Sequence, residues 1–206
     1  MKLKPLLILS IYSTVLAGCA TAGADYQTHA KSQYAALSVD HFTKTMTIND
    51  DELETSAQFS TYKGSRPNAS GDLYLSLVSN PNDEFMRAHV FKDSGKEVYQ
   101  MYFLLSSSEW KRPSQINFTA GLGSKPTDRI AIDAKCTSAS CTNFEDVIVN
   151  FTRSELERTV TTLDQSSEPL LKFRIKGQSG KDYDGSLSVN EIKAVLQAVE
   201  KHKIES

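Results

Sequence analysis

The hydrophobic pattern divides the chain into an apolar N-terminal run, a long middle region of period two and a helical pattern near the C-terminus. From about Val39 the period is two, and its clearest example is Leu171–Ile175, where apolar and basic residues alternate as in a half-buried strand. Apolar residues spaced three and four apart from Val189 to Val199 predict a helix with one apolar face. Other strands are expected at 53–60, 73–77, 85–92, 97–105, 130–136 and 146–151, with short helices at 25–37 and from Ser154, where Glu157 would complete a capping box.

These elements predict the fold class. The segment Val98–Leu105 is apolar on both faces, so it is expected to be a central strand with another layer packed over it. Asp93–Lys96 has the composition of a hairpin turn, and 63–71 is expected to be a loop. The stretch 106–128 is expected to be largely irregular, with an extended segment at 116–118. Strands in runs with helices mainly at the ends favour an α+β fold, a mostly antiparallel sheet of hairpins with the C-terminal helix on one face.

The first 18 residues have a different character. Two lysines precede an apolar stretch from Leu6 to Leu16, and small residues follow. A charged start, a short apolar centre and small residues at the end are typical of a secretory signal. The apolar run is too short for a stable membrane span, which needs about 20 residues.

A cysteine directly follows the small residues. The tetrapeptide Leu16-Ala17-Gly18-Cys19 resembles the lipobox of bacterial lipoproteins, whose cysteine is lipidated and becomes the new N-terminus. The resemblance implies a signal peptide at 1–18, a lipid on Cys19 and a tether at 19–24. The remaining residues, 25–206, are a comfortable length for a single domain. It also implies a protein anchored to a membrane by its N-terminal lipid and facing the periplasm. Ala20 resembles the pattern sorted to the outer membrane in Gram-negative bacteria.

The net charge and the catalytic motifs of the sequence bear on which classes of function are expected. Removal of residues 1–18 leaves 188 of 206 residues and, with Lys2 and Lys4 gone, takes the formal charge from −2 to −4. A mildly acidic chain without a basic stripe argues against nucleic acid as a partner. The sequence has no Gly-x-Ser-x-Gly, His-Glu-x-x-His or phosphate-loop motif. Ser60-x-x-Lys63 matches one motif of the serine β-lactamases, but it ends a predicted strand and the partner motifs are absent.

Two cysteines remain after Cys19. Cys136 and Cys141 would lie in an oxidising compartment, and four small residues, three of them polar, separate them, as at a loop tip. A disulfide would staple a hairpin and contribute about 2 kcal/mol. The alternative is half of a zinc site, but such sites usually have a second close ligand pair, and the four histidines are isolated from one another and from the cysteines. A redox pair usually has two intervening residues rather than four.

One acidic segment suggests a cation site. From Asp182 to Glu191 the chain resembles the later part of an EF-hand loop, with Asp182 and Asp184 as early ligands, Gly185 at the turn and Glu191 at the last position. The first ligand position holds glycine, however, and a strand pattern precedes the loop where an EF-hand has a helix. The same residues also fit a turn at Asp184-Gly185 and a helix capped by Ser188 and Glu191. Calcium is therefore an alternative, and no other cofactor is expected.

Trp110, Lys111 and Arg112 form the candidate interaction surface. They place the single tryptophan beside two cations in the long region 106–128. Tryptophan and arginine are typical anchors at protein interfaces, and an aromatic residue beside basic ones also suits a membrane surface. The alternative is a tryptophan packed on the edge of the sheet with solvated neighbours.

A loose family resemblance covers about Val98 to Val199. This stretch resembles a group of uncharacterised exported proteobacterial proteins, with which it shares Cys136-x4-Cys141, Glu145 before an apolar strand, a short helix with Leu156, a strand ending near Gly177 and a closing helix. The group has no activity to carry over, so the resemblance implies only the fold.

The sequence favours a lipid-anchored cell-envelope lipoprotein that acts as a non-catalytic binding or assembly module for another envelope protein. One alternative is an enzyme or small-ligand-binding protein whose site is assembled from distant residues. The other is a calcium-stabilised domain.

Overall fold

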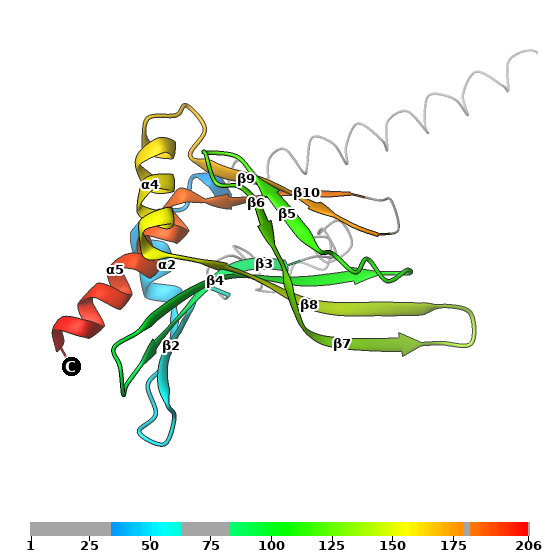
Figure 1. Cartoon of the computed structure of the whole chain (residues 1–206), viewed down its shortest axis with the longest axis horizontal. Coiled ribbons are helices and arrows are strands. Elements are labelled where there is room, and N and C mark those ends of the chain that lie inside the picture. Colours follow the sequence, from blue (N-terminus) through cyan, green and yellow to red (C-terminus); the bar gives the residue numbers. More distant parts are fainter. Residues whose placement is uncertain (1–33, 63–82, 179–181, 206) are drawn as a thin grey trace, which may run out of the picture.

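The computed structural model describes residues 34–62, 83–178 and 182–205. Within these ranges the chain forms two antiparallel sheets and three helices, an α+β fold as expected. The sheets lie one over the other, and the helices gather at one end (Figure 1). The predicted signal peptide, Cys19, the tether, the loop at 63–71 and the strand at 73–77 lie outside the described residues, as does most of the helix expected at 25–37.

The larger sheet has the strand order β1-β2-β3-β4-β8-β7, and every pairing in it is antiparallel. The hairpin predicted around Asp93–Lys96 is confirmed, and Gly95 in its turn has a φ of 65°, a conformation that suits glycine. The strands are β1 (Thr47–Asn49), β2 (Ser56–Ser60), β3 (Asp83–Phe91), β4 (Glu97–Ser107), β7 (Asp128–Cys136) and β8 (Cys141–Phe151).

The smaller sheet has the order β10-β9-β5-β6. It consists of β5 (Gln115–Phe118), β6 (Gly123–Pro126), β9 (Leu170–Lys176) and β10 (Tyr183–Ser188). Only Thr127 separates β6 from β7, so one extended segment passes from the smaller sheet to the larger. The expected antiparallel architecture is thus divided between two sheets. The stretch 106–128 is less irregular than expected: the extended segment expected at 116–118 lies in β5, which is ordered by pairing with β9, more than fifty residues away.

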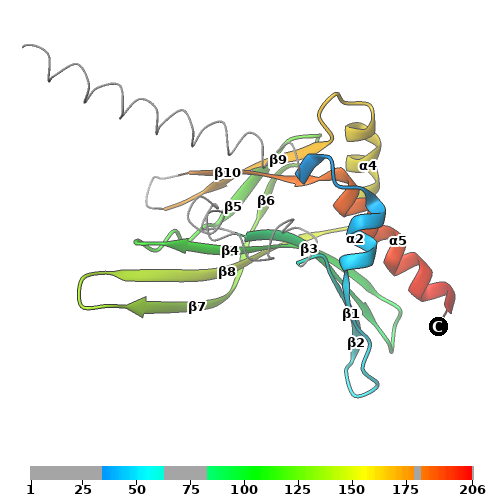
Figure 2. The ribbon, with the colours of Figure 1, turned by 180° about the vertical axis from the view of Figure 1, so that it is seen from behind.

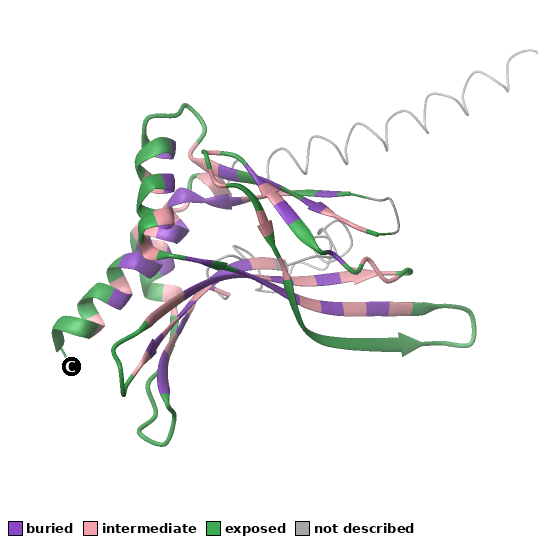
Figure 3. Ribbon diagram, in the orientation of Figure 1, coloured by how far each residue is buried: buried purple, intermediate pink, exposed green. Residues whose placement is uncertain are grey.

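The core lies between the two sheets (Figure 3). The rings of Phe103 on β4 and Phe173 on β9 meet edge to face at 5.2 Å between centroids, and Phe118 on β5 meets Phe151 on β8 at 5.5 Å. Such aromatic pairs add to the stabilisation from burial alone. The prediction that β4 is a central, covered strand is confirmed.

The helices are α2 (Val39–Thr45), α4 (Arg153–Asp164) and α5 (Val189–Glu205). Helix α5 packs against β2, β3 and β10, with α2 beside it (Figure 2). Its predicted apolar face is confirmed, with buried side chains at Val189, Ile192, Val195, Leu196 and Val199.

Three local expectations were wrong. Residues 39–45 form α2, capped by the Ser38 side chain, where a strand period was expected. Leu53 is 88% exposed in the turn before β2, although the alternation placed it in a strand. Helix α4 is capped by Thr152, directly after β8, so its capping box joins Thr152 with Glu155 rather than Ser154 with Glu157.

Gly185 also departs from expectation, because it lies within β10 opposite Phe173 rather than in a turn. A Cβ at this position would clash with the Phe173 ring. The glycine therefore serves close packing between the β10 backbone and a core aromatic ring, as in pairs where an aromatic side chain covers a strand glycine.

Candidate functional site

The Trp110–Arg112 segment is held in place by a buried carboxylate on β8. Glu145 is 1% exposed, and its oxygens accept the backbone N–H of Lys111 at 2.6 Å and of Arg112 at 3.0 Å. Arg112 has a φ of 44°, which is uncommon for a residue other than glycine. The carboxylate thus fixes two successive amides and the unusual turn between them.

A cation completes the surroundings of Glu145. Arg129, on the edge strand β7, donates through Nη1 to Glu145 at 3.3 Å and is itself 40% exposed. A buried carboxylate is costly unless hydrogen bonds and charge compensate it, and here two amides and a guanidinium do so. Glu145 therefore links the 110–112 loop to both strands of the β7–β8 hairpin.

The three predicted surface residues differ in exposure. Trp110 and Lys111 are half-buried, and Arg112 is exposed. The Lys111 ammonium lies 5.4 Å from the centre of the Tyr183 ring. Burial lowers the pKa of Lys111 while the Glu145 charge opposes that shift. The loop thus offers part of an indole and one solvated guanidinium on a backbone that is already fixed.

The EF-hand-like carboxylates do not converge. Asp182 pairs with Lys176 at 2.7 Å, and Asp184 forms a two-pronged ion pair with Arg174 at 2.5 and 2.8 Å on the exposed side of the smaller sheet. Glu191 is instead fully buried at the start of α5. Within the described ranges no three His, Cys, Asp or Glu side chains gather as a group that could hold a metal ion.

Glu191 belongs to a buried polar cluster. Its carboxylate accepts from the Tyr34 hydroxyl at 2.6 Å, from the Thr61 hydroxyl at 2.5 Å and from the Met86 amide at 2.8 Å. The Tyr34 hydroxyl also accepts the N–H of Ser188 at 2.9 Å. In the expected capping box Glu191 would accept this N–H directly, whereas here Tyr34 relays it. Burial, and then the nearby Glu191 charge, raise the pKa of Tyr34, so the phenol stays a donor.

Glu84 is a second carboxylate beside this cluster, and sequence reasoning missed it. It lies on the face of β3 that also carries Met86 and Ala88, and the Tyr183 hydroxyl donates to it at 3.1 Å. Burial raises the pKa of Glu84 to about 7, assisted by repulsion from Glu191 and opposed by the Tyr183 hydrogen bond. The sequence signal that could have placed Glu84 on this buried face is its period-two spacing with Met86 and Ala88.

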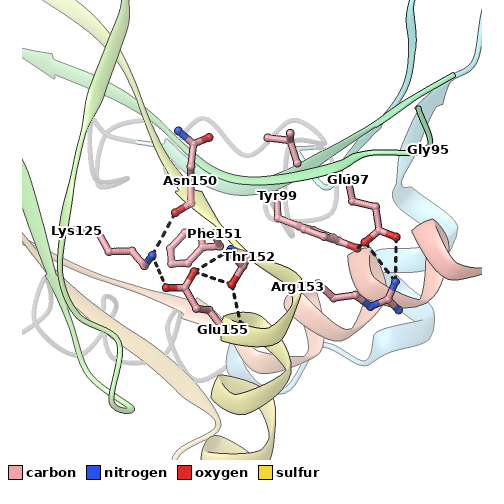
Figure 4. A pocket seen from close by; sticks show the side chains of 10 residues that line it. Gly95, Glu97, Tyr99, Lys125, Asn150, Phe151, Thr152, Arg153 and Glu155 are labelled. Carbon is pink, nitrogen blue, oxygen red and sulfur yellow. Dashed lines mark hydrogen bonds and ion pairs between the residues drawn. The ribbon is translucent and has the colours of Figure 1, made fainter. Parts of the chain in front are cut away.

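A cleft of about 660 Å³ lies between β4, β6 and the start of α4 (Figure 4). Lys125 and Glu155 pair on one side of it at 2.7 Å. Glu97 lies on the other side, where it accepts from Tyr99 at 2.8 Å and pairs with Arg153 at 3.3 Å. The remaining lining includes Asn150, Phe151 and Thr152.

The chemistry of this cleft is that of paired charges. Although burial opposes the shift, hydrogen bonds from Lys203 and Tyr99 lower the pKa of Glu97, and those from Lys125 and Thr152 lower that of Glu155. Both carboxylates are therefore ionised near neutral pH and poorly suited to donate a proton. The lining residues bring together no serine, cysteine or histidine that could act as a nucleophile with its base.

The predicted disulfide is present. Cys136 and Cys141 face each other as the last β7–β8 pair, with an S–S distance of 2.01 Å. The hairpin that they close extends to the end of the molecule away from the helices (Figure 1). The cysteines thus staple the hairpin tip, as expected from their spacing.

No family model, curated protein or solved structure matches this chain. No helix in the described parts of the chain is long and apolar enough to cross a bilayer.

Proposed function

We propose that this protein is a lipid-anchored lipoprotein of the bacterial envelope, and that it binds another envelope protein through the loop formed by Trp110, Lys111 and Arg112. The lipobox-like Leu16–Cys19 supports the anchor, which would hold the domain on the periplasmic face of a membrane, the outer one in a Gram-negative cell. The observation that carries the binding role is the fixation of this loop by buried Glu145.

A fixed loop lowers the cost of association. Ordering mobile side chains and loops opposes binding, so a backbone held in advance leaves more of the contact energy for the complex. Trp110 supplies apolar area and Arg112 supplies a solvated planar cation, the two residue types enriched where interfaces contribute most. An exposed charge on a strained backbone stabilises the monomer little, which supports a role outside the fold. The favoured partner surface is an apolar pocket edged by carboxylates.

The charged cleft beside α4 is where the alternative, a small-ligand binder or enzyme, would have its site. Its Lys125 and Arg153 are already engaged by Glu155 and Glu97. An anionic ligand would have to break these ion pairs, so the cleft supports binding less well than the fixed loop.

The test is crosslinking in intact cells followed by capture of the full-length protein and mass spectrometry. Wild type is compared with Trp110→Ala and Arg112→Gly, the second chosen because glycine accepts the φ of 44° at this position. Lys44→Ala changes an exposed lysine on α2 and is the matched control. We expect one stoichiometric envelope protein that is lost in both loop variants and kept in the control. Recovery of the same abundant membrane proteins in all four samples would contradict the proposal.

A further inference from the structure

Strand β7 is an exposed sheet edge. Among the described residues it is the last strand of the larger sheet, with β8 as its one neighbour. All nine of its residues are exposed along its length (Figure 3). Two of them are isoleucines, Ile130 at 47% and Ile132 at 59%. Such an edge presents backbone donors and acceptors that a further strand could use.

A bulge divides this edge in two. The pairing register shifts between Arg129 and Ala131, whereas residues 131–136 pair regularly with β8 up to the disulfide. Bulges and charges usually prevent edge-to-edge association. The first half of β7 is protected in this way, while the second half is a regular strand.

The hairpin tip shows which backbone groups point outward. Thr137 donates its N–H to the Ser140 carbonyl at 2.8 Å. Hydrogen-bonded and non-bonded pairs alternate in an antiparallel ladder, so Ala134 falls in a non-bonded pair with Asn143 and turns its N–H and C=O away from β8. In agreement with this, the Ala134 N–H donates a hydrogen bond to the Asp133 carboxylate at 2.8 Å rather than to β8.

The side chains of residues 131–136 are complementary to those of a second copy of the same strand in one pairing register. Two copies of β7 that pair antiparallel are related by a twofold axis, and the residue on that axis faces itself. With Asp133 on the axis two aspartates would face each other, and with Lys135 on the axis two lysines would do so. With Ala134 on the axis, Asp133 of each copy lies opposite Lys135 of the other, on the face of the sheet that carries Phe144. On the other face it sets exposed Ile132 against the disulfide of Cys136. Opposite charges and apolar pairs directly across a sheet are favourable, and like charges are not.

We propose that two copies of this protein pair antiparallel through residues 131–136 of β7, with the twofold axis at Ala134, joining their larger sheets. In the dimer the Ala134 N–H donates to the partner's carbonyl, and the Asp133 carboxylate is released to face Lys135 across the interface. This inference uses an edge separate from the 110–112 loop and does not depend on the proposed envelope partner.

Charge exchange tests the register. The full-length protein in mild detergent is followed by analytical ultracentrifugation as wild type, Asp133→Lys, Lys135→Asp and the double exchange. Each single change sets two like-charged pairs across the axis, and we expect dimer affinity to fall about tenfold or more. The double exchange should restore it, and Trp110→Ala should leave it unchanged.

A cysteine at the axis tests the geometry. Ala134→Cys faces itself in the proposed dimer at a Cα separation of about 5.5 Å, within the range of a disulfide, whereas Ala131→Cys does not face itself. We expect oxidative dimers from the first variant and few from the second. A chain that stays monomeric, a dimer indifferent to the charge changes, or equal crosslinking at both positions would overturn the proposal.

Discussion

Replacement of Glu84 by glutamine should remove a pH-dependent loss of stability that this carboxyl imposes on the fold. Burial holds the pKa of Glu84 at about 7 in the native protein, against an ordinary value of 4.5. The folded state therefore binds a proton more tightly than the unfolded state. The stability from this group is fully present below pH 4.5 and is lost as the pH rises through 7.

The magnitude follows from the size of the shift. A difference of about 2.5 pKa units corresponds to about 3 kcal/mol, because each unit is worth 1.36 kcal/mol. Glutamine keeps an oxygen that can accept from the Tyr183 hydroxyl, but it carries no charge at any pH. Relative to wild type, the free energy of unfolding of Glu84→Gln should thus rise by about 3 kcal/mol between pH 4 and pH 8.

Urea unfolding of both proteins at half-unit steps between pH 4 and pH 8.5 measures this difference directly. The other titrating groups are common to the two chains, so most of their contributions cancel in the subtraction. Glu52→Gln, at an exposed position before β2, is the control for loss of a carboxylate in general. A difference curve that is flat, or that falls toward high pH, would refute the reasoning about the Glu84 environment.

Four further changes probe other contacts. Gly185→Ala should cost about 1–3 kcal/mol in chemical denaturation, because its Cβ displaces the Phe173 ring; a neutral result would show that the ring can move. Joint replacement of Cys136 and Cys141 by serine should cost about 2 kcal/mol, and reduced wild type should unfold like the variant. Glu145→Gln should cost about 1–3 kcal/mol and speed amide exchange at 110–112, whereas unchanged exchange would remove Glu145 as the support of the loop. Asp184→Ala breaks an exposed ion pair and should cost less than about 1 kcal/mol, and a larger loss confined to calcium-containing buffer would favour the calcium alternative.

Local patterns predicted much of the fold. The alternation in Leu171–Ile175, the apolar face of Val189–Val199 and the composition of Asp93–Lys96 each reflect burial or turn preferences within a few residues. These gave β9, α5 and the β3–β4 hairpin at nearly their observed bounds. The disulfide followed from the separation of the two cysteines, because a tight loop brings them together whatever the rest of the chain does.

The smaller sheet could not be predicted in full, because β5 is aligned by β9, more than fifty residues later in the chain. Strand β6 is Gly-Ser-Lys-Pro and has no apolar alternation, so its own pattern does not predict a strand, and it is extended by pairing with the neighbouring β5. Helix α2 was missed because a short helix owes its stability to packing on its neighbours rather than to its own pattern. Here α2 packs against α5, which begins about 150 residues later in the chain.

The candidate site likewise contains some residues that the local sequence indicates and others whose role depends on the tertiary fold. Trp110 and Arg112 were singled out as candidates because of their residue types. The role of Glu145 as the support of their loop depends on β8 running beside that loop, which spacing does not reveal. Glu191 was singled out as a weak metal ligand, yet its distance of four residues from Val195 already placed it on the apolar face of α5. Its partners come from three other segments, and only the tertiary fold brings them together.

The most direct test of the proposed function is site-specific photocrosslinking in living cells. A photoreactive residue is placed at position 112 of the full-length protein, and in a second strain at Ser94, an exposed position in the β3–β4 turn. We predict one discrete adduct with an envelope protein from position 112 and none from position 94. The same adducts from both positions, or none from position 112, would contradict a binding role for the loop.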